Sequence, residues 1–354
     1  VSEAGQSYSW FENAHEYRLS PWNNDPVTDL AGEAFYIRDE ESGKFWSPTP
    51  LPAYSKSNYI TRHGFGYSIF EHLYDGIYSE MIVFVDIKLS VKYSVLKIRN
   101  ESNRSRKLTI TGYVDWVLGD LRSKCNMHII TEREVNTGAI FARNIYNTEF
   151  GSRIAFFDLD DDNKVLTADR TEFIGRNGSM RSPDAMGKSR LSGKLGAAMD
   201  PCGAIQTVIE LADKEERELV FRLGAGKDWP ETAAIAKQCE GLACAQQAFK
   251  DVKEYWERTL GIIQIETPDH ALNILSNGWL NYQTIASRIW GRSGFYQSGG
   301  AFGFRDQLQD TLSLMHSDPA LVKKQLLLCA SRQFKEGDVQ HWWHPPMGRG
   351  VRTT

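Results

Sequence analysis

A polar cluster stands between Gly299 and Asp310, where the sequence is GGAFGFRDQLQD. Its glycines allow the backbone to approach a ligand closely. If the second half is helical, Arg305 and Gln309 form one row, because residues four apart are neighbours on a helix. Asp306 and Asp310 form the adjacent row. A guanidinium beside a carboxylate supplies donors and acceptors for sugar hydroxyls. The alternative is a solvated helix start, with ordinary ion pairs and an Asp near the positive end of the helix dipole.

A second cluster covers Gly337 to Arg352, GDVQHWWHPPMGRGVR. Prolines and glycines make this stretch a poor helix and a poor strand, so we expect an ordered loop of the kind that often carries function. Trp342, Trp343 and His344 are candidate substrate-binding residues, with core packing as the alternative for one tryptophan. His341 and His344 lack an evident third ligand, so we expect no metal site.

Length and composition limit the class of protein. The 354 residues are too many for one typical core and predict two structural units. A hydrophobic fraction of 41% and a charged fraction of 24% are typical of soluble globular proteins. The net charge of -4 and the lack of a Lys/Arg cluster argue against a nucleic-acid partner.

The cysteine pattern and the hydropathy indicate the compartment. Five cysteines, an odd number, fit neither a disulfide framework nor a zinc site. We expect reduced thiols in a cytoplasmic protein. The sequence contains no apolar run of about 18 residues, the length that a membrane span needs, and no signal peptide is evident.

Residues 1–228 predict an antiparallel β-sandwich, because apolar and polar residues alternate over many short segments. We expect the clearest strand at Glu80–Asn100 and a hairpin formed by Thr207–Ala212 and Leu219–Leu223. The remaining expected strands are Lys107–Leu118, Ala139–Tyr146 and Arg153–Leu159.

Helical patterns follow the strands. Residues 229–266 predict a helical linker, with Pro230 suited to a helix start. Residues 267–354 predict three amphipathic helices, beginning near Asp269, at Arg305 and after Asp318. Three such helices cannot close a helical barrel. We therefore expect a fragment, or partner helices from another polypeptide.

Both polar clusters resemble known signature segments. Arg292–Asp310 and Glu336–Arg352 are similar to segments of glycoside hydrolase family 94. That family contains inverting cellobiose, chitobiose and β-1,2-oligoglucan phosphorylases, and the phosphorylase-like module of cyclic β-1,2-glucan synthases. Trp10–Pro26 and Ala34–Thr49 resemble its N-terminal domain.

The resemblance implies a β-sandwich, a helical linker and the start of an (α/α)6 barrel. It also implies that Arg305 and Asp306 hold the hydroxyls of the non-reducing-end glucose. Arg292 matches an arginine near the phosphate, and Arg349 is a second candidate phosphate ligand. Cellobiose-type members carry an arginine where Gly300 stands here. This difference favours the β-1,2-glucan branch.

The family's chemistry is a direct displacement in which a carboxylic acid protonates the leaving oxygen while phosphate attacks the anomeric carbon. In the family the general acid lies well downstream of the HWWHP segment. We therefore assign no catalytic residue here and expect this chain alone to be inactive. Phosphate is a co-substrate, and no cofactor is expected.

The expected partners are a β-linked gluco-oligosaccharide and phosphate. By resemblance we also expect a homodimer, or a second chain that carries the rest of the barrel. Two alternatives stay open. One is the phosphorylase-like module of a cyclic β-1,2-glucan synthase, and the other is a non-catalytic carbohydrate-binding protein.

Overall fold

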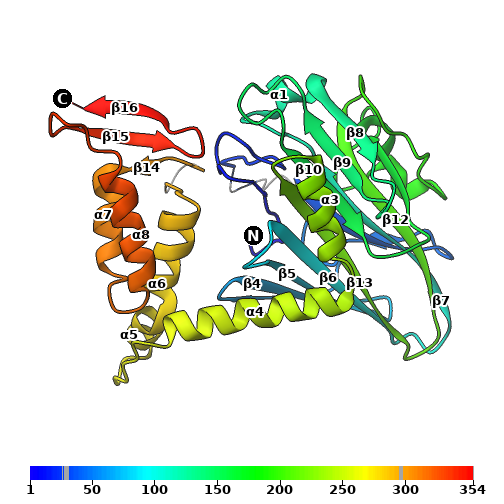
Figure 1. Ribbon diagram of the computed structural model, residues 1–354. Coiled ribbons are helices and arrows are strands. Elements are labelled where there is room, and N and C mark those ends of the chain that lie inside the picture. Colours follow the sequence, from blue (N-terminus) through cyan, green and yellow to red (C-terminus); the bar gives the residue numbers. More distant parts are fainter. Residues whose placement is uncertain (26, 28–31, 295–297, 354) are drawn as a thin grey trace. The chain divides into compact units, whose positions relative to one another are not determined.

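The computed structural model describes residues 1–25, 27, 32–294 and 298–353. The chain forms two compact units (Figure 1). The first contains residues 1–9 and 18–251, and the second contains residues 10–17 and 252–354. A short N-terminal segment, Trp10–Tyr17, therefore belongs to the unit that is otherwise formed by the end of the chain.

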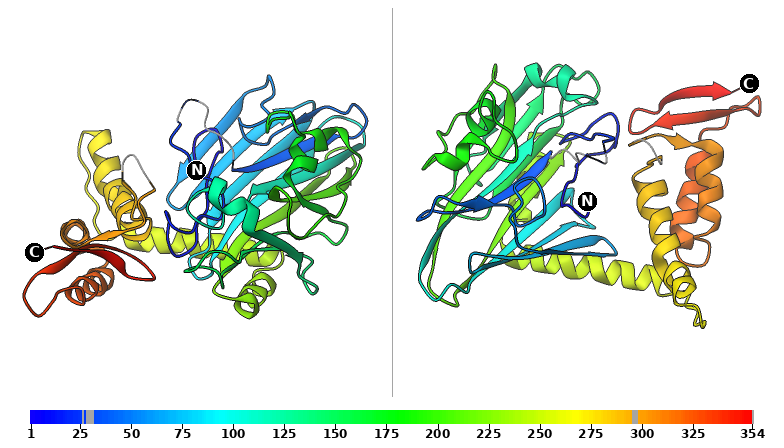
Figure 2. Two further views of the ribbon diagram at one scale, coloured as in Figure 1. Left: turned by 90° about the horizontal axis from the view of Figure 1, so that it is seen from above. Right: turned by 180° about the vertical axis from the view of Figure 1, so that it is seen from behind.

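The first unit is built on two antiparallel sheets that face each other (Figure 2). The five-stranded sheet has the order β11-β12-β7-β1-β2, and the eight-stranded sheet has the order β3-β4-β5-β6-β13-β10-β9-β8. The first consists of β1 (Glu33–Asp39), β2 (Phe45–Trp46), β7 (Arg106–Asp115), β11 (Val165–Asp169) and β12 (Pro201–Leu211). The second consists of β3 (Tyr59–Gly64), β4 (Tyr67–Tyr74), β5 (Ile77–Val85), β6 (Val91–Asn100), β8 (Ile129–Arg133), β9 (Ile140–Asn144), β10 (Ile154–Leu159) and β13 (Glu216–Gly226). The predicted antiparallel sandwich is confirmed.

Aromatic side chains fill the space between the sheets. Phe35 of β1 meets Phe221 of β13 edge to face, with ring centroids 5.1 Å apart. Gly112 of β7 faces the same ring, and a Cβ atom at this position would lie 2.6 Å from Phe221. The close approach of the two sheets therefore requires glycine at position 112.

The predicted single strand at Glu80–Asn100 is two strands. β5 ends at Val85, β6 begins at Val91, and the two pair antiparallel. The Asp86 carboxylate accepts hydrogen bonds from the backbone N–H groups of Lys88 (2.7 Å) and Leu89 (3.1 Å). This turn reverses the chain, although the apolar–polar alternation continues through it.

The predicted hairpin near Asp213 is also wrong. β12 pairs with β7 and β11, whereas β13 pairs with β6 and β10, so residues 212–215 cross from one sheet to the other. The chain also passes from one sheet to the other between β6 and β7, and buried Asn100 lies at this second crossing. Its side chain donates to the carbonyls of Arg104 (2.7 Å), Leu211 (3.0 Å) and Ala212 (3.0 Å). One carboxamide thus holds both crossings together.

Helices are few in the first unit. The short ones are α1 (Arg122–Cys125), α2 (Arg170–Ile174) and 3-10 turns at Asn126–His128 and Asp184–Gly187, followed by α3 (Trp229–Gln238) and α4 (Leu242–Leu260). Asp228 caps α3 by accepting from Glu231 N, and Pro230 occupies the first turn as predicted. α3 packs on β10 and β13, which explains why every residue of β10 is buried. None of the helices in the described ranges is both long and apolar enough to cross a bilayer.

The second unit contains a kinked helix, two further helices and a small sheet. The kinked helix comprises α5 (His270–Ile274), a π-turn at Leu275–Trp279, α6 (Leu280–Gln283) and a π-turn at Thr284–Trp290. α7 spans Phe304–Leu312 and α8 spans Pro319–Ala330. The sheet has the order β14 (Phe302–Gly303), β15 (Val339–His344) and β16 (Arg349–Thr353).

Two predicted helix starts are confirmed and one predicted loop is wrong. Asp269 accepts from Ala271 N and Leu272 N, and Asp318 accepts from Leu321 N. The stretch after Gly337, predicted to be a loop, forms the β15–β16 hairpin instead. Its two prolines and Gly348 fall in the connecting turn, and Gly350 lies within β16 opposite Trp343, so the ladder is not interrupted. The predicted linker, residues 229–266, is shared between the two units because their boundary lies within α4.

A buried ion network attaches α3 to the eight-stranded sheet. Arg222 of β13, only 1% exposed, pairs with Asp158 (2.6 Å) and with Asp160. The same guanidinium donates to Ala236 O (2.6 Å) and to Cys239 Sγ (3.2 Å) at the end of α3. Because Arg222 is the shared partner, its loss removes the ion pair of Asp160 and leaves fully buried Asp158 with Lys164, 2.5 Å away.

Replacing Arg222 with Met is therefore expected to lower the free energy of unfolding by about 3–5 kcal/mol. Urea unfolding followed by circular dichroism measures the loss. The matched control is Arg143→Met in the same sheet, where Arg143 and Glu132 are 39% and 44% exposed. That variant is expected to cost about 0–1 kcal/mol. Equal losses in the two variants would contradict the assigned role of the network.

Candidate functional site

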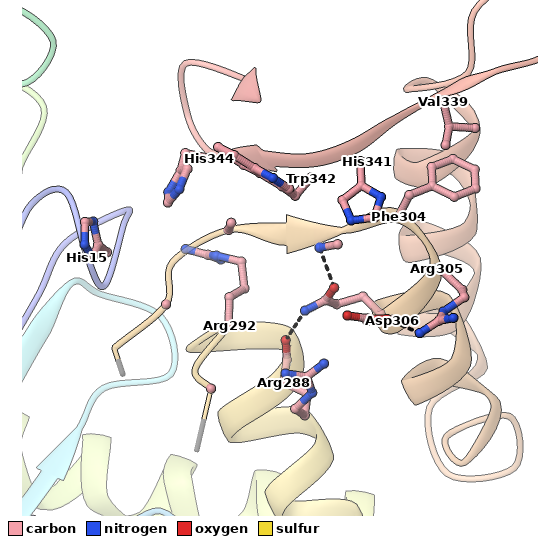
Figure 3. Close-up of a pocket in the computed structure, with 15 residues that line it drawn as sticks. His15, Arg288, Arg292, Phe304, Arg305, Asp306, Val339, His341, Trp342 and His344 are labelled. Atoms are coloured by element: carbon pink, nitrogen blue, oxygen red, sulfur yellow. Dashed lines mark hydrogen bonds and ion pairs between the residues drawn. The ribbon is translucent and has the colours of Figure 1, made fainter. Parts of the chain in front are cut away.

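The second unit contains a cavity of about 670 Å³ (Figure 3). Its walls come from the segment Trp10–Tyr17, the end of the kinked helix, residues 292–294 and 299–303, the first turn of α7, and β15. The lining residues are His15, Arg288, Arg292, Gly294, Gly299, Ala301, Gly303, Phe304, Arg305, Asp306, Gln307, Val339, His341, Trp342 and His344.

The first turn of α7 carries the predicted sugar-binding pair. Arg305 and Asp306 form an ion pair of 3.3 Å, and their side chains are 82% and 55% exposed. Buried Gln307 fixes this turn, because its Oε1 accepts from Gly303 N (2.6 Å) and its Nε2 donates to Arg288 O (3.5 Å). The pair is therefore accessible to a ligand, while the hydrogen bonds of Gln307 fix the backbone that carries it.

The tandem tryptophans have different roles. In the pairing of β14 with β15, Phe302 faces Trp343 and Gly303 faces Trp342. Trp343 is 1% exposed and packs with Phe302 and Cys329, whereas Trp342 is 37% exposed and lines the cavity. A β-bulge between Gln340 and Trp342 interrupts the alternation, so both His341 and Trp342 reach the cavity.

The structure brings together five of the nine predicted site residues: Arg292, Arg305, Asp306, Trp342 and His344. The other four do not line the cavity. Gln309 is exposed on α7, Asp310 pairs with Arg288 at 2.8 Å, Trp343 lies in the core, and Arg349 of β16 lies 3.5 Å from Glu16.

Arg292 is the predicted phosphate ligand, and its backbone is strained, with φ of 50°. Its guanidinium donates to Gly300 O (2.9 Å) and Glu12 O (2.7 Å), and it lies 4.9 Å from the ring centre of Phe302. Burial lowers the pKa of Arg292 to about 10. In the described part of the chain its partners are carbonyls rather than carboxylates, so its positive charge remains available to an anion.

Gly299 and Gly300 lie close to the backbone of Arg292. Gly299 has φ of 65° and Gly300 has φ of 94°, a region that favours glycine. Gly300 N donates to Arg292 O at 2.9 Å. A Cβ atom at position 300 would lie 2.2 Å from Asn13 Oδ1. With Asn13 in place, position 300 therefore has no room for a side chain.

The segment Trp10–Tyr17 is the part of the site that sequence reasoning missed. His15 lines the cavity, Asn13 bonds to Gly300 O (3.2 Å) and Pro345 O (2.8 Å), and Glu16 lies 3.7 Å from His344 Nδ1. The resemblance assigned this segment only to the N-terminal domain. No pattern of spacing links it to residues near the other end of the chain.

The lining is predominantly basic. Three arginines and three histidines face the cavity, and Asp306 is its one carboxylate among the residues that the structure describes. Such a lining suits a ligand that has both hydroxyls and an oxyanion. Within the described ranges, no three His, Cys, Asp or Glu side chains gather closely enough to hold a metal ion.

Replacing Gly300 with Ala is expected to lower the free energy of unfolding of the second unit by about 1–3 kcal/mol, because a Cβ at φ of 94° is strained and would also displace Asn13. Limited proteolysis should then cut within Trp10–Tyr17. The matched control is Gly337→Ala, which has φ of 96° but nothing within 4 Å of a Cβ atom. If both variants resist proteolysis equally, the contact with Asn13 does not hold the segment.

Comparisons with known proteins identify the family of both parts of the chain. The supersandwich domain of glycosyl hydrolase 94 matches residues 1–241, and the catalytic domain of the glycosyl hydrolase 94 superfamily matches residues 255–354. The cyclic beta-(1,2)-glucan synthase NdvB of Rhizobium meliloti is 40% identical over all of this chain and 12% of its own length. The N,N'-diacetylchitobiose phosphorylase of Vibrio furnissii is 27% identical over 98% of this chain and 44% of its own length. The chain thus spans less than half of either relative.

A solved structure shows the same fold at low sequence identity. A bacterial glucoamylase complexed with acarbose superimposes with a TM-score of 0.57 over 96% of this chain and 52% of its own, at 10% identity. The likeness supports a sandwich followed by the first helices of an (α/α) barrel. With both domain types matched in order, the chain belongs to the glycosyl hydrolase 94 family.

Proposed function

We propose that this site binds the non-reducing end of a β-1,2-linked gluco-oligosaccharide beside inorganic phosphate. The reaction is an inverting phosphorolysis that gives α-glucose 1-phosphate. The observation that carries the proposal is that one cavity holds both the Arg305–Asp306 pair and Arg292.

The Arg305–Asp306 pair suits a sugar. Vicinal hydroxyls each donate and accept, so they are matched by a carboxylate beside a guanidinium. Trp342, also in the cavity, offers a flat apolar face on which a pyranose ring stacks. The exposure of all three groups leaves room for a ligand to replace water.

Arg292 suits the phosphate. Its carbonyl partners leave its charge uncompensated, and the ring of Phe302 lies close to the guanidinium. A charge-assisted hydrogen bond to a phosphate oxygen is therefore favourable at this position. Arg288 is a weaker candidate, because Asp310 already neutralises it.

Phosphorolysis and hydrolysis differ in the carboxylates that they require. An inverting hydrolase needs one carboxylic acid for the leaving group and a second carboxylate to activate water. Phosphate is already an anion and needs no such base. Asp306, the cavity's one described carboxylate, is assigned to sugar binding, and the general acid remains unassigned.

A second candidate function is favoured by one specific comparison. The 40% identity with a cyclic β-1,2-glucan synthase extends over the whole chain, compared with 27% for the chitobiose phosphorylase. This identity supports a β-1,2-glucan as the substrate in both readings. It also supports the second hypothesis, that the chain is the phosphorylase-like module of such a synthase.

The test uses the product of the full reading frame. With phosphate and a sophorose-type oligosaccharide, we expect release of glucose 1-phosphate. Asp306→Asn is expected to lower kcat/KM roughly 10- to 100-fold, because a hydrogen bond to a charged group is lost. The matched control is Glu336→Gln, an exposed carboxylate paired with Arg352, which should leave the rate unchanged.

Three outcomes separate the hypotheses. Release of free glucose without phosphate would contradict phosphorolysis. Activity on cellobiose but not on sophorose would contradict the assigned linkage. Synthesis of cyclic β-1,2-glucan by the full product would favour the second candidate.

A further inference from the structure

The carboxamide of Asn13 has a fixed orientation. The side chain is fully buried, and its Oδ1 accepts hydrogen bonds from His15 N (2.9 Å) and Glu16 N (3.0 Å). Two backbone N–H groups can only donate, so the atom that faces them must be the oxygen. The amide nitrogen therefore points in the opposite direction.

The nitrogen of Asn13 faces two carbonyl oxygens and one ring nitrogen. Nδ2 lies 2.8 Å from Pro345 O, 3.2 Å from Gly300 O and 3.3 Å from His344 Nδ1. The two carbonyls can only accept, which agrees with the assignment of Oδ1. Two amide hydrogens shared among these three atoms make a three-centre arrangement, which is common in proteins. His344 Nδ1 therefore faces a hydrogen-bond donor.

A donor at Nδ1 determines the tautomer of a neutral imidazole. Nδ1 must then be the acceptor, and the ring proton sits on Nε2. Glu16 Oε1 is a competing group, at 3.7 Å from Nδ1, which is beyond a normal hydrogen bond. The guanidinium of Arg349 lies 3.5 Å from that same carboxylate oxygen and offsets part of its charge. Asn13 is the nearer of the two groups to Nδ1 and lies within hydrogen-bonding distance.

We propose that Asn13 is a positioning residue that holds His344 with its proton on Nε2, so that the ring donates a hydrogen bond to an oxygen of the bound ligand. The proposal rests on the proposed function for the identity of that ligand. His344 lines the cavity beside Trp342, with ring centroids 5.5 Å apart, and beside His15 at 5.9 Å. The acceptor is an oxygen of either the sugar or the phosphate.

This role explains why a segment far from the site in sequence is built into it (Figure 3). The same carboxamide bonds to Pro345, which follows β15, and to Gly300, which precedes β14. It thus couples the orientation of His344 to the loop that holds Arg292, which itself donates to Gly300 O. Without Asn13, the ring of His344 could adopt the other tautomer.

The first experiment reads the tautomer directly. In the chain labelled with ¹⁵N-histidine, long-range ¹H–¹⁵N spectra distinguish a protonated ring nitrogen from an unprotonated one, and His344→Gln identifies the signal. We expect an unprotonated Nδ1 and a protonated Nε2 at neutral pH. A proton on Nδ1 in the unaltered chain would overturn the proposal, whatever the activity of the protein.

The decisive variant is Asn13→Asp. It keeps an oxygen for the N–H groups of His15 and Glu16 but replaces the donor that faces His344 with an acceptor. We expect the proton of His344 to move to Nδ1, or the ring to become a cation. An unchanged tautomer would overturn the proposal. The ring signals of His270 and His316, which lie in the second unit with Asn13, report whether that unit is folded in the variant.

The second experiment tests the effect on the ligand in the product of the full reading frame. Asn13→Asp is expected to lower kcat/KM about tenfold, as for a lost hydrogen bond. A rise in KM for the oligosaccharide alone assigns the acceptor to the sugar, and a rise for phosphate alone assigns it to phosphate. Unchanged values for both would overturn the donor role. Because the tautomer is read without turnover, failure of phosphorolysis and failure of this proposal are distinguishable.

Discussion

The short ladder between β14 and β15 is the constraint on which the site depends. Trp343 is buried against Phe302 and Cys329, and this packing fixes which face of β15 points into the core. Trp342 must then face the cavity, next to the first turn of α7 that carries Arg305. A core tryptophan thus sets the position of a surface tryptophan, because the two are adjacent on one strand.

The second constraint is the set of hydrogen bonds that Arg292 makes with Gly300 and Glu12. A positive φ at a non-glycine residue is costly and persists only where its surroundings over-determine it. Here the surroundings are the hydrogen bonds with Gly300 in both directions and the bond to Glu12 O. The result is a guanidinium that is fixed in place and still cationic, as the binding of an oxyanion requires.

Local chemistry was predictable from sequence, and long-range pairing was not. The helix starts near Asp269 and after Asp318 were predicted because a capping contact depends only on neighbouring residues. The turn near Asp213 has the same local signal whether the next strand returns to the same sheet or crosses to the other, and only packing decides between them. The contribution of Asn13 could not be inferred either, since its partners Gly300 and Pro345 lie far away in sequence.

Exposure separates the residues that hold the fold from those that remain available for a ligand. The ion pair of Arg305 and Asp306 is largely solvated, so it adds little to stability. Its partners in the same motif, Gln307 and Phe302, are buried and fix the backbone around it. A ligand that covers the pair also removes water from it, and hydrogen bonds to both groups then become stronger. These two side chains therefore contribute more to the free energy of ligand binding than to the free energy of folding.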